Sequence, residues 1–146
     1  MKKTILALCA FGAIFVGCNE KKDSQNITEL LKSKETWNII SLENKEKGKE
    51  KIVNFGDDKG SEYNLGFKEE GFFGNFGCNS VFGSYKIENE TLEFSNAGAT
   101  KKMCPPEIME NEDALMKGIL SNKIKIIVNK DSSISLQAEN ISVILK

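Results

Sequence analysis

The most reactive side chains in this sequence belong to two cysteines, Cys78 and Cys104, each in an unusual local context. Cys78 lies in the glycine- and phenylalanine-rich stretch 71–85, and Cys104 lies in the stretch 100–106, which reads TKKMCPP. Paired cysteines in an oxidising compartment favour a disulfide, so we expect the two stretches to meet in space. Two buried thiols and a redox pair are the alternatives. A redox pair is disfavoured because the spacing is not CxxC and the chain has no histidine.

Three polar residues near the cysteines could line a binding or catalytic site: Asn79, Thr100 and Glu112. An asparagine after a Gly-Cys corner more often satisfies backbone groups, and we expect Thr100 to bond to the backbone likewise. Glu112 falls on the apolar stripe of a predicted helix, where a carboxylate needs hydrogen bonds or a cation. Lys101, Lys102 or backbone N–H groups are its candidate partners. No second carboxylate or nucleophile accompanies Glu112, so we expect a structural tie between helix and sheet and not an enzyme.

The charged residues argue against two classes of function. All twenty basic residues are lysines, there is no histidine, and the formal net charge is −1. Arginine is the best bidentate group for phosphates and base edges, and there is no basic excess, so nucleic-acid binding is not expected. Without histidine the chain lacks the commonest metal ligand and general base, so neither a metal site nor a cofactor is expected.

The N-terminus has the features of a secretion signal. Two lysines precede an apolar run, residues 4–16, that is too short to span a membrane comfortably. The run ends in FVGC, residues 15–18, which resembles a bacterial lipobox. We therefore predict a lipoprotein signal peptide over residues 1–17, with acylation of Cys18 as a stable membrane anchor. An ordinary secretory signal with a chance cysteine and a mitochondrial-type presequence are the alternatives.

The residue after this cysteine, Asn19, bears on which membrane receives the protein. Aspartate there would indicate inner-membrane retention by the enterobacterial sorting rule, so asparagine favours the outer membrane, facing the periplasm. The polar residues that follow have nothing to bury, and we predict an acylated cysteine with a flexible tether over residues 18–35. Within this segment, residues 27–32 are expected to make a short helix or a lead-in turn. The folded domain is then expected over residues 36–146.

Alternating apolar and polar residues predict a series of short strands. The cluster at 56–60 reads as a turn, and the charged segment 43–51 is expected to be a hairpin loop. Pro105 and Pro106 mark the start of one amphipathic helix. These elements favour a mainly β fold, with an antiparallel sheet curled into a small barrel or open barrel and one packed α-helix. Strands are predicted at 36–42, 51–55, 63–67, 71–76, 80–88, 92–94, 123–128, 133–137 and 141–145. The expected inward-facing residues include Trp37, Ile39, Ser41, Ile124, Ile126 and Val128.

Four phenylalanines gather in one part of the predicted sheet: Phe72, Phe73, Phe76 and Phe82. Strand alternation sends Phe72 and Phe73 to opposite faces. We expect most of the cluster to be plain core and helix packing. The alternative is that one ring is exposed or lines a cavity for an apolar ligand.

Together these residues resemble the META domain, and in particular the HslJ-like bacterial envelope lipoproteins. The resemblance rests on a GCNxxxGxY run paired with a TxxMC run, a combination that is fairly specific. It covers about residues 36–146 and implies a small β-rich domain linked to heat-stress and antibiotic-stress responses. Lys101 and Lys102 stand where relatives often have arginine. The matching residues are Gly77, Cys78, Asn79, Phe82, Gly83, Tyr85, Thr100, Met103, Cys104 and Glu112.

The resemblance and the N-terminal signal lead to one expected function and two alternatives. We expect a stress-associated, lipid-anchored envelope protein that acts as a non-enzymatic binding module for an unidentified partner. The first alternative is a carrier or sensor that holds an apolar ligand between helix and sheet. The second is an inhibitor of an envelope hydrolase, which would insert the loop at 43–51 or at 56–60 into an active site.

Overall fold

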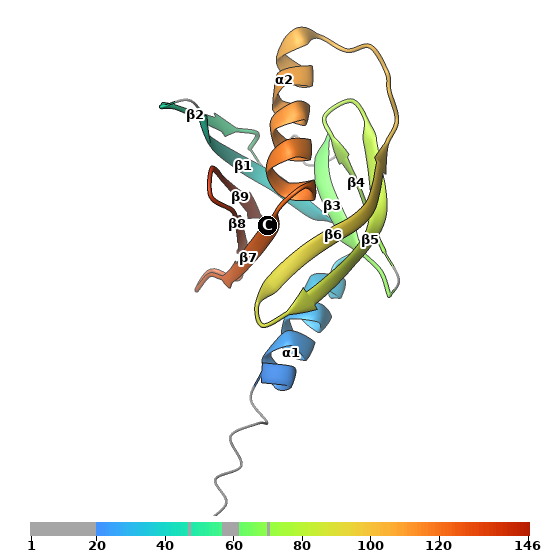
Figure 1. Cartoon of the computed structure of the whole chain (residues 1–146), viewed down its shortest axis with the longest axis vertical. Coiled ribbons are helices and arrows are strands. Elements are labelled where there is room, and N and C mark those ends of the chain that lie inside the picture. The colour runs from blue at the N-terminus through green and yellow to red at the C-terminus, as the bar shows by residue number, and fades with distance from the viewer. Residues whose placement is uncertain (1–19, 47, 57–61, 70) are drawn as a thin grey trace, which may run out of the picture.

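The computed structural model describes residues 20–46, 48–56, 62–69 and 71–146 (Figure 1). Within these residues nine strands form one antiparallel sheet. They are β1 Trp37–Glu46, β2 Lys49–Asn54, β3 Tyr63–Phe67, β4 Phe72–Phe76, β5 Ser80–Glu88, β6 Thr91–Ala99, β7 Lys123–Val128, β8 Ile134–Gln137 and β9 Ile141–Leu145. Strands β3 to β9 follow one another around the sheet, and β1 pairs with both β3 and β9. This pairing closes eight strands into a barrel and leaves β2 attached to β1 alone, so the predicted small barrel is confirmed.

The barrel interior is a packed apolar core. Alternate residues of the strands point inward, as the pleat requires. Ile134 and Leu136 of β8, for example, are fully buried, as are Val143 and Leu145 of β9. The register of β1 against β9, with Leu42 opposite Val143, brings buried residues of the first and last barrel strands together.

Strand β1 departs from simple alternation. Its pairing with β9 shifts between Ile39 and Ser41, which marks a β-bulge. Trp37 and Ile39 are buried as predicted, but after the bulge Leu42 is buried and Ser41 is only half-buried. The extra residue reverses the alternation, and the inward position predicted for Ser41 is therefore wrong.

Two further expectations need correction. The charged segment 43–51 is not a loop, because β1 continues to Glu46 and β2 begins at Lys49. The two strands form a ribbon, β1–β2, in which the charged side chains pair across the strands, with Lys45 opposite Glu50. At the end of β7, Val128 is 49% exposed and does not join Ile124 and Ile126 in the core.

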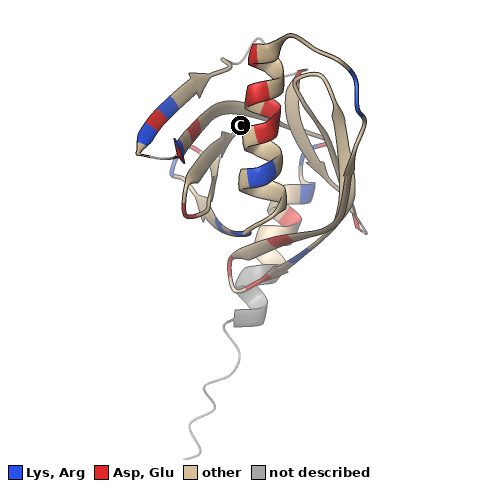
Figure 2. Cartoon of the chain, turned by 45° about the horizontal axis from the view of Figure 1, so that its top comes forward, with Lys and Arg blue, Asp and Glu red and all other residues tan. Residues whose placement is uncertain are grey.

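One helical segment lies across the space that the strands enclose (Figure 2). It consists of α2, Pro106–Leu115, and a π-helical turn η1, Met116–Leu120. The prediction of a helix start at the prolines is confirmed, with Pro106 in the first turn, where a missing N–H costs nothing. Leu115 and Ile119 are fully buried, so this segment completes the core.

A second helix, α1, Glu20–Lys32, precedes the barrel and occupies much of the segment predicted to be a flexible tether. Leu31 is fully buried and its carbonyl accepts a 2.8 Å hydrogen bond from the indole of Trp37. Ile27 is also buried, and Lys32 pairs with Glu69 at 2.7 Å. The end of α1 is therefore docked on the barrel, opposite the start of α2 (Figure 1).

The predicted signal peptide 1–17, the predicted acylation site Cys18 and most of the turn at 56–60 lie outside the described residues. In the described part of the chain, neither helix is long and apolar enough to cross a bilayer.

Candidate functional site

The site predicted from the sequence forms around a tight corner between β4 and β5. The backbone N–H of Phe76 donates to the carbonyl of Asn79 at 3.1 Å, and Gly77 between them has φ +107°. A Cβ at Gly77 would lie 2.8 Å from both Ile108 of α2 and the hydroxyl of Tyr63. Glycine is needed here for its conformation and for the close approach of α2.

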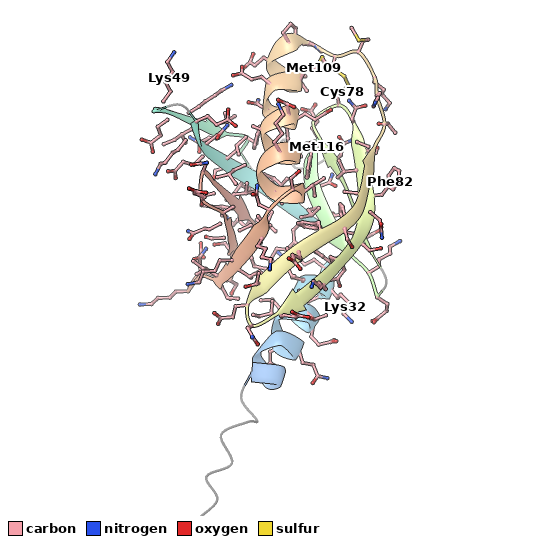
Figure 3. All side chains as sticks on the ribbon, viewed as in Figure 1. Lys32, Lys49, Cys78, Phe82, Met109 and Met116 are labelled. Carbon is pink, nitrogen blue, oxygen red and sulfur yellow. A yellow bond between two sulfur atoms is a disulfide. The ribbon has the colours of Figure 1, made fainter. Side chains whose placement is uncertain are left out.

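The two cysteines meet across this corner. Cys78 and Cys104 form a disulfide, with their Cα atoms 6.4 Å apart. The bond ties the β4–β5 corner to the segment that connects β6 to α2, and Figure 3 shows Cys78 beside the upper part of α2. The predicted disulfide and the predicted meeting of the two stretches are both confirmed.

Asn79 is the centre of a hydrogen-bond network beneath the disulfide, and it is only 3% exposed. Its backbone N–H donates to one Glu112 carboxylate oxygen at 3.0 Å, and its side-chain amide donates to the other at 2.8 Å. Its side-chain oxygen accepts from the Thr100 hydroxyl at 2.9 Å and from the backbone N–H of Lys102 at 2.8 Å. Thr100 in turn accepts from the N–H of Ser80 at 3.1 Å.

This network accounts for the three polar residues singled out from the sequence. Asn79 uses both its amide donor and its carbonyl acceptor, and Glu112 accepts hydrogen bonds at both oxygens. Of the partners proposed for Glu112, a backbone N–H is present, whereas Lys102 bonds to Asn79 through its main chain. The arrangement is a joint between helix and sheet, and among the described residues no nucleophile or second carboxylate is bonded to Glu112.

The other residues that carry the resemblance lie on β5 and in the segment before α2. Met103 is 92% exposed beside Cys104, and Phe82 is 54% exposed on the outer face of β5. A Cβ at Gly83 would lie 2.9 Å from the carbonyl oxygen of Ser95, so β6 approaches closely there. Tyr85 donates from its hydroxyl to the carbonyl of Lys68 at 3.0 Å.

The phenylalanine cluster divides between core and surface. Phe72 and Phe76 are buried, and Phe72 packs edge-on against Phe94 with ring centroids 4.6 Å apart. Phe73 is half-buried on the opposite face and lies under the ammonium of Lys68 at 4.7 Å. The two inner rings are therefore packing residues, as expected.

A slot that the sequence did not indicate lies between the β1–β2 ribbon and α2. Its volume is about 90 Å³. The buried residue Asn111 lines it, is 6% exposed, and has a side-chain oxygen with no hydrogen-bond partner among the described residues. Burial raises the pKa of nearby Tyr63, and a hydrogen bond from Asn111 opposes that rise. The slot is lined by Leu42, Asn44, Glu46, Lys51, Val53, Glu110, Asn111, Asp113 and Ala114.

Comparison with known families decides what this fold is. The family model for the META domain matches residues 26–145. The chain belongs to the META-domain family. The match begins at residue 26 and not at 36, so the second half of α1 is part of the META domain.

Solved structures support the same META-domain fold. A protein from Burkholderia xenovorans, determined by NMR, superimposes with a TM-score of 0.64 at 17% identity, covering 100% of this chain and 97% of that one. A second NMR structure gives a TM-score of 0.60 at 19% identity, covering 82% of this chain and 92% of that one. At these identities the likeness shows the fold alone. No curated protein matches the chain.

Proposed function

We propose that this META-domain protein is a lipid-anchored, stress-associated protein of the bacterial envelope that acts as a non-enzymatic binding module. The observation that carries the proposal is the joint around Asn79. The residues that could have done chemistry, Glu112 and the two cysteines, are bonded into the scaffold by hydrogen bonds and a disulfide. Such a joint holds a rigid barrel surface in place, which is what a binding module requires.

The proposed location draws on the sequence and on the disulfide. The lipobox-like sequence ends at Cys18, two residues before α1 begins at Glu20. A disulfide between Cys78 and Cys104 suits an oxidising compartment such as the periplasm. Asn19 favours the outer membrane over the inner one.

The anchor is tested by membrane fractionation of cells that express the full chain. The wild-type protein should enter the membrane fraction and carry acyl mass on its N-terminal peptide. Cys18→Ser should lose both, whereas Cys9→Ser, within the predicted signal, should keep both. A Cys18→Ser protein that stays in the membrane fraction would refute the lipid anchor.

The non-enzymatic role is tested by separating stability from activity. In a strain that lacks the protein, survival of heat stress would be measured for Glu112→Gln, Asp113→Asn and Ile119→Val. If Glu112 is structural, survival follows the melting temperature across all three variants. Loss of survival for Glu112→Gln at an unchanged melting temperature would instead indicate a catalytic carboxylate.

The β1–β2 ribbon favours the inhibitor as a second candidate function. Strand β2 pairs with β1 alone, and its residues are exposed except for the half-buried Val53. Figure 3 shows Lys49 at the far tip of this ribbon. A projecting ribbon is the kind of element that can enter an enzyme cleft, and shortening it should abolish inhibition while the closed barrel still folds.

A further inference from the structure

Two phenylalanines are neighbours on the outer face of the barrel. The registers of strands β3 to β6 place Gly66, Phe73, Phe82 and Gly98 in one row across the sheet, each opposite the next. We call these four residues the aromatic row. Phe82 is 54% exposed, and Figure 3 shows it on the outer side of the sheet. The row is therefore an apolar feature of the surface and not an extension of the core.

Both side chains of the aromatic row lean across the sheet, over the glycines at its two ends. A Cβ built on Gly98 would lie 2.9 and 3.0 Å from two ring atoms of Phe82, and one built on Gly66 would lie 2.5 Å from the ring of Phe73. Contacts this close are possible because glycine has no side chain. Each ring thus lies along the surface of the sheet instead of standing upright from it, which leaves a broad, low apolar platform.

The two rings differ in what covers them. The ammonium of Lys68 lies 4.7 Å from the centre of the Phe73 ring, which is a cation–π contact. Within the part of the chain that the structure describes, no cation and no second ring is stacked on Phe82 in this way. Phe82 is therefore the ring that is open to a ligand, and Lys68 is a hydrogen-bond donor at the other end of the row.

The surroundings of Phe82 are polar but uncharged. Ser80 and Ser84 share its face of β5, because alternate residues of a strand point the same way, and Ser84 lies opposite Ser95 of β6. Their hydroxyls can both donate and accept hydrogen bonds. Charged residues make up 28% of the chain, yet none occurs between residues 71 and 85 or between residues 94 and 100. This face therefore suits a neutral ligand that carries hydrogen-bonding groups.

The exposed apolar area is too small for a stable contact with another protein. A phenylalanine side chain offers about 150–250 Å². With Phe82 54% exposed and Phe73 half-buried, the two rings leave on the order of 200 Å² of apolar surface. A standard protein interface buries about 800 Å² on each partner. The platform therefore fits one or two rings of a smaller ligand better than a folded partner or a second copy of this chain.

A sugar ring has the complementary chemistry. The broad sides of the ring carry C–H groups, which are attracted to the electron-rich face of an aromatic ring. The edge carries hydroxyls, which pair with serine side chains. In β-linked glucose units the large substituents all lie around the edge, so both broad sides are apolar and the chain is flat and extended. Such a chain is also neutral, as this face of the barrel requires.

We propose that the aromatic row binds a flat, neutral, β-linked glycan. One sugar ring stacks on Phe82 and bonds through its hydroxyls to Ser80 and Ser84, and the chain continues along the row toward Lys68. The joint around Asn79 fixes the corner between β4 and β5, the two strands that carry the rings, so the platform is rigid. The inference rests on the proposed role as a non-enzymatic binding module and names its surface and ligand class, but it does not depend on acylation at Cys18.

The test is an NMR titration of the ¹⁵N-labelled full-length protein with two matched sugars. Cellotetraose should shift the backbone N–H signals of Phe82, Ser84 and Gly98, with a Kd in the millimolar range. Maltotetraose has the same composition and charge, but its α-linkages curl the chain, and it should shift these signals far less at equal concentration. Equal shifts with both sugars, no shifts, or shifts that map elsewhere would overturn the proposal. Shifts of the same signals on concentrating the protein without sugar would overturn it too, in favour of self-association.

Variants of Phe82 separate stacking from folding. Phe82→Leu keeps an apolar cover over Gly98 but removes the ring, and it should weaken cellotetraose binding about fivefold, whereas Phe82→Trp enlarges the ring and should tighten it about twofold. Ile52→Ala removes another exposed apolar side chain, 60% exposed on β2, and should leave the Kd unaltered. An unchanged Kd for both Phe82 variants, at unchanged melting temperature, would refute the site. A failed titration with an intact Cys18 anchor would reject the glycan surface and leave the proposed location standing.

Discussion

Asn79 and Glu112 are joined by two hydrogen bonds, of 3.0 and 2.8 Å, although 33 residues of sequence separate them. One donor is the backbone N–H of Asn79 and the other is its side-chain amide. Bonds to an ionised acceptor are about twice as strong as those between neutral groups. This pair ties the middle of the helical segment to the β4–β5 corner, and Cys78 of the same corner forms the disulfide with Cys104.

Replacing Glu112 by glutamine should destabilise the protein by about 1–3 kcal/mol. Glutamine has one acceptor oxygen, so one of the two donors of Asn79 would face an NH₂ group. The free energy of unfolding in urea measures the loss. Asp113→Asn, which alters an exposed ion pair with Lys117, is the control and should change stability by less than about 0.5 kcal/mol. Equal effects of the two variants would contradict the joint.

Gly77→Ala should be strongly destabilising. The backbone conformation at this position strains any residue with a Cβ, and the added atom would clash with α2. Gly77 has φ +107°, and the added atom would lie 2.8 Å from Ile108 and from Tyr63. Gly48 is a matched control, with φ +73° and open space around the Cβ position. We expect Gly48→Ala to cost about 1 kcal/mol and Gly77→Ala clearly more. Thermal melts of both variants provide the measurement.

Removing the disulfide should lower stability by roughly 3–4 kcal/mol, since it closes a long loop in the unfolded chain. The Cys78→Ala, Cys104→Ala double variant should still fold, because the hydrogen bonds of Asn79 remain. Unreduced protein should not react with a thiol reagent at either cysteine, and reduction should expose both. Labelling of Cys78 in unreduced protein would show that the bond is absent.

Acidification should weaken the fold through carboxylates that are bonded in the folded state. Hydrogen bonds from Ser133 hold the pKa of Asp131 below its ordinary value, and Lys86 and then Lys123 do the same for Glu93. A lowered folded-state pKa adds stability above the ordinary carboxyl range, and this stability is lost as pH falls below about 4. The urea midpoint at pH 6 and pH 3 measures the loss. Asp131→Asn should show a smaller drop, and an unchanged drop would contradict this assignment.

Helix α1 should contribute to stability as part of the domain. Leu31 is fully buried and Leu30 only partly so. Leu31→Ala should therefore cost about 2–5 kcal/mol, and Leu30→Ala should cost less. Urea unfolding distinguishes them. If both variants reduced the free energy of unfolding by the same small amount, α1 would not be part of the folded domain, and the flexible tether predicted from the sequence would be correct.

The sequence predicts most of the barrel because its strands alternate clearly. Strands such as β3 and β7 have the predicted bounds, and the two stretches with the cysteines meet as expected. The sequence predicts a short helix or a lead-in turn at residues 27–32, but not the full helix α1, because its apolar contacts, Ile27 and Leu31, follow a polar run that has no apolar face of its own. The β-bulge after Ile39 could not be predicted either, because the residue types around it do not mark an extra residue in the strand.

The slot could not be predicted for a different reason. Its residues come from the β1–β2 ribbon and from α2, which are far apart in the sequence and meet only in the folded structure. Asn111 reads in the sequence as one polar residue among several on a charged helix. Only the folded structure shows that it is buried and that its oxygen lacks a partner.

The pairing of β1 with β9 also constrains the order in which the strands of the barrel can pair. The first barrel strand finds this neighbour only when the last of the nine strands is available. A chain that emerges from the ribosome with its N-terminus first can form the hairpins one by one, but its sheet stays open until β9 emerges. Closure is therefore a late event between distant segments, which favours slow folding.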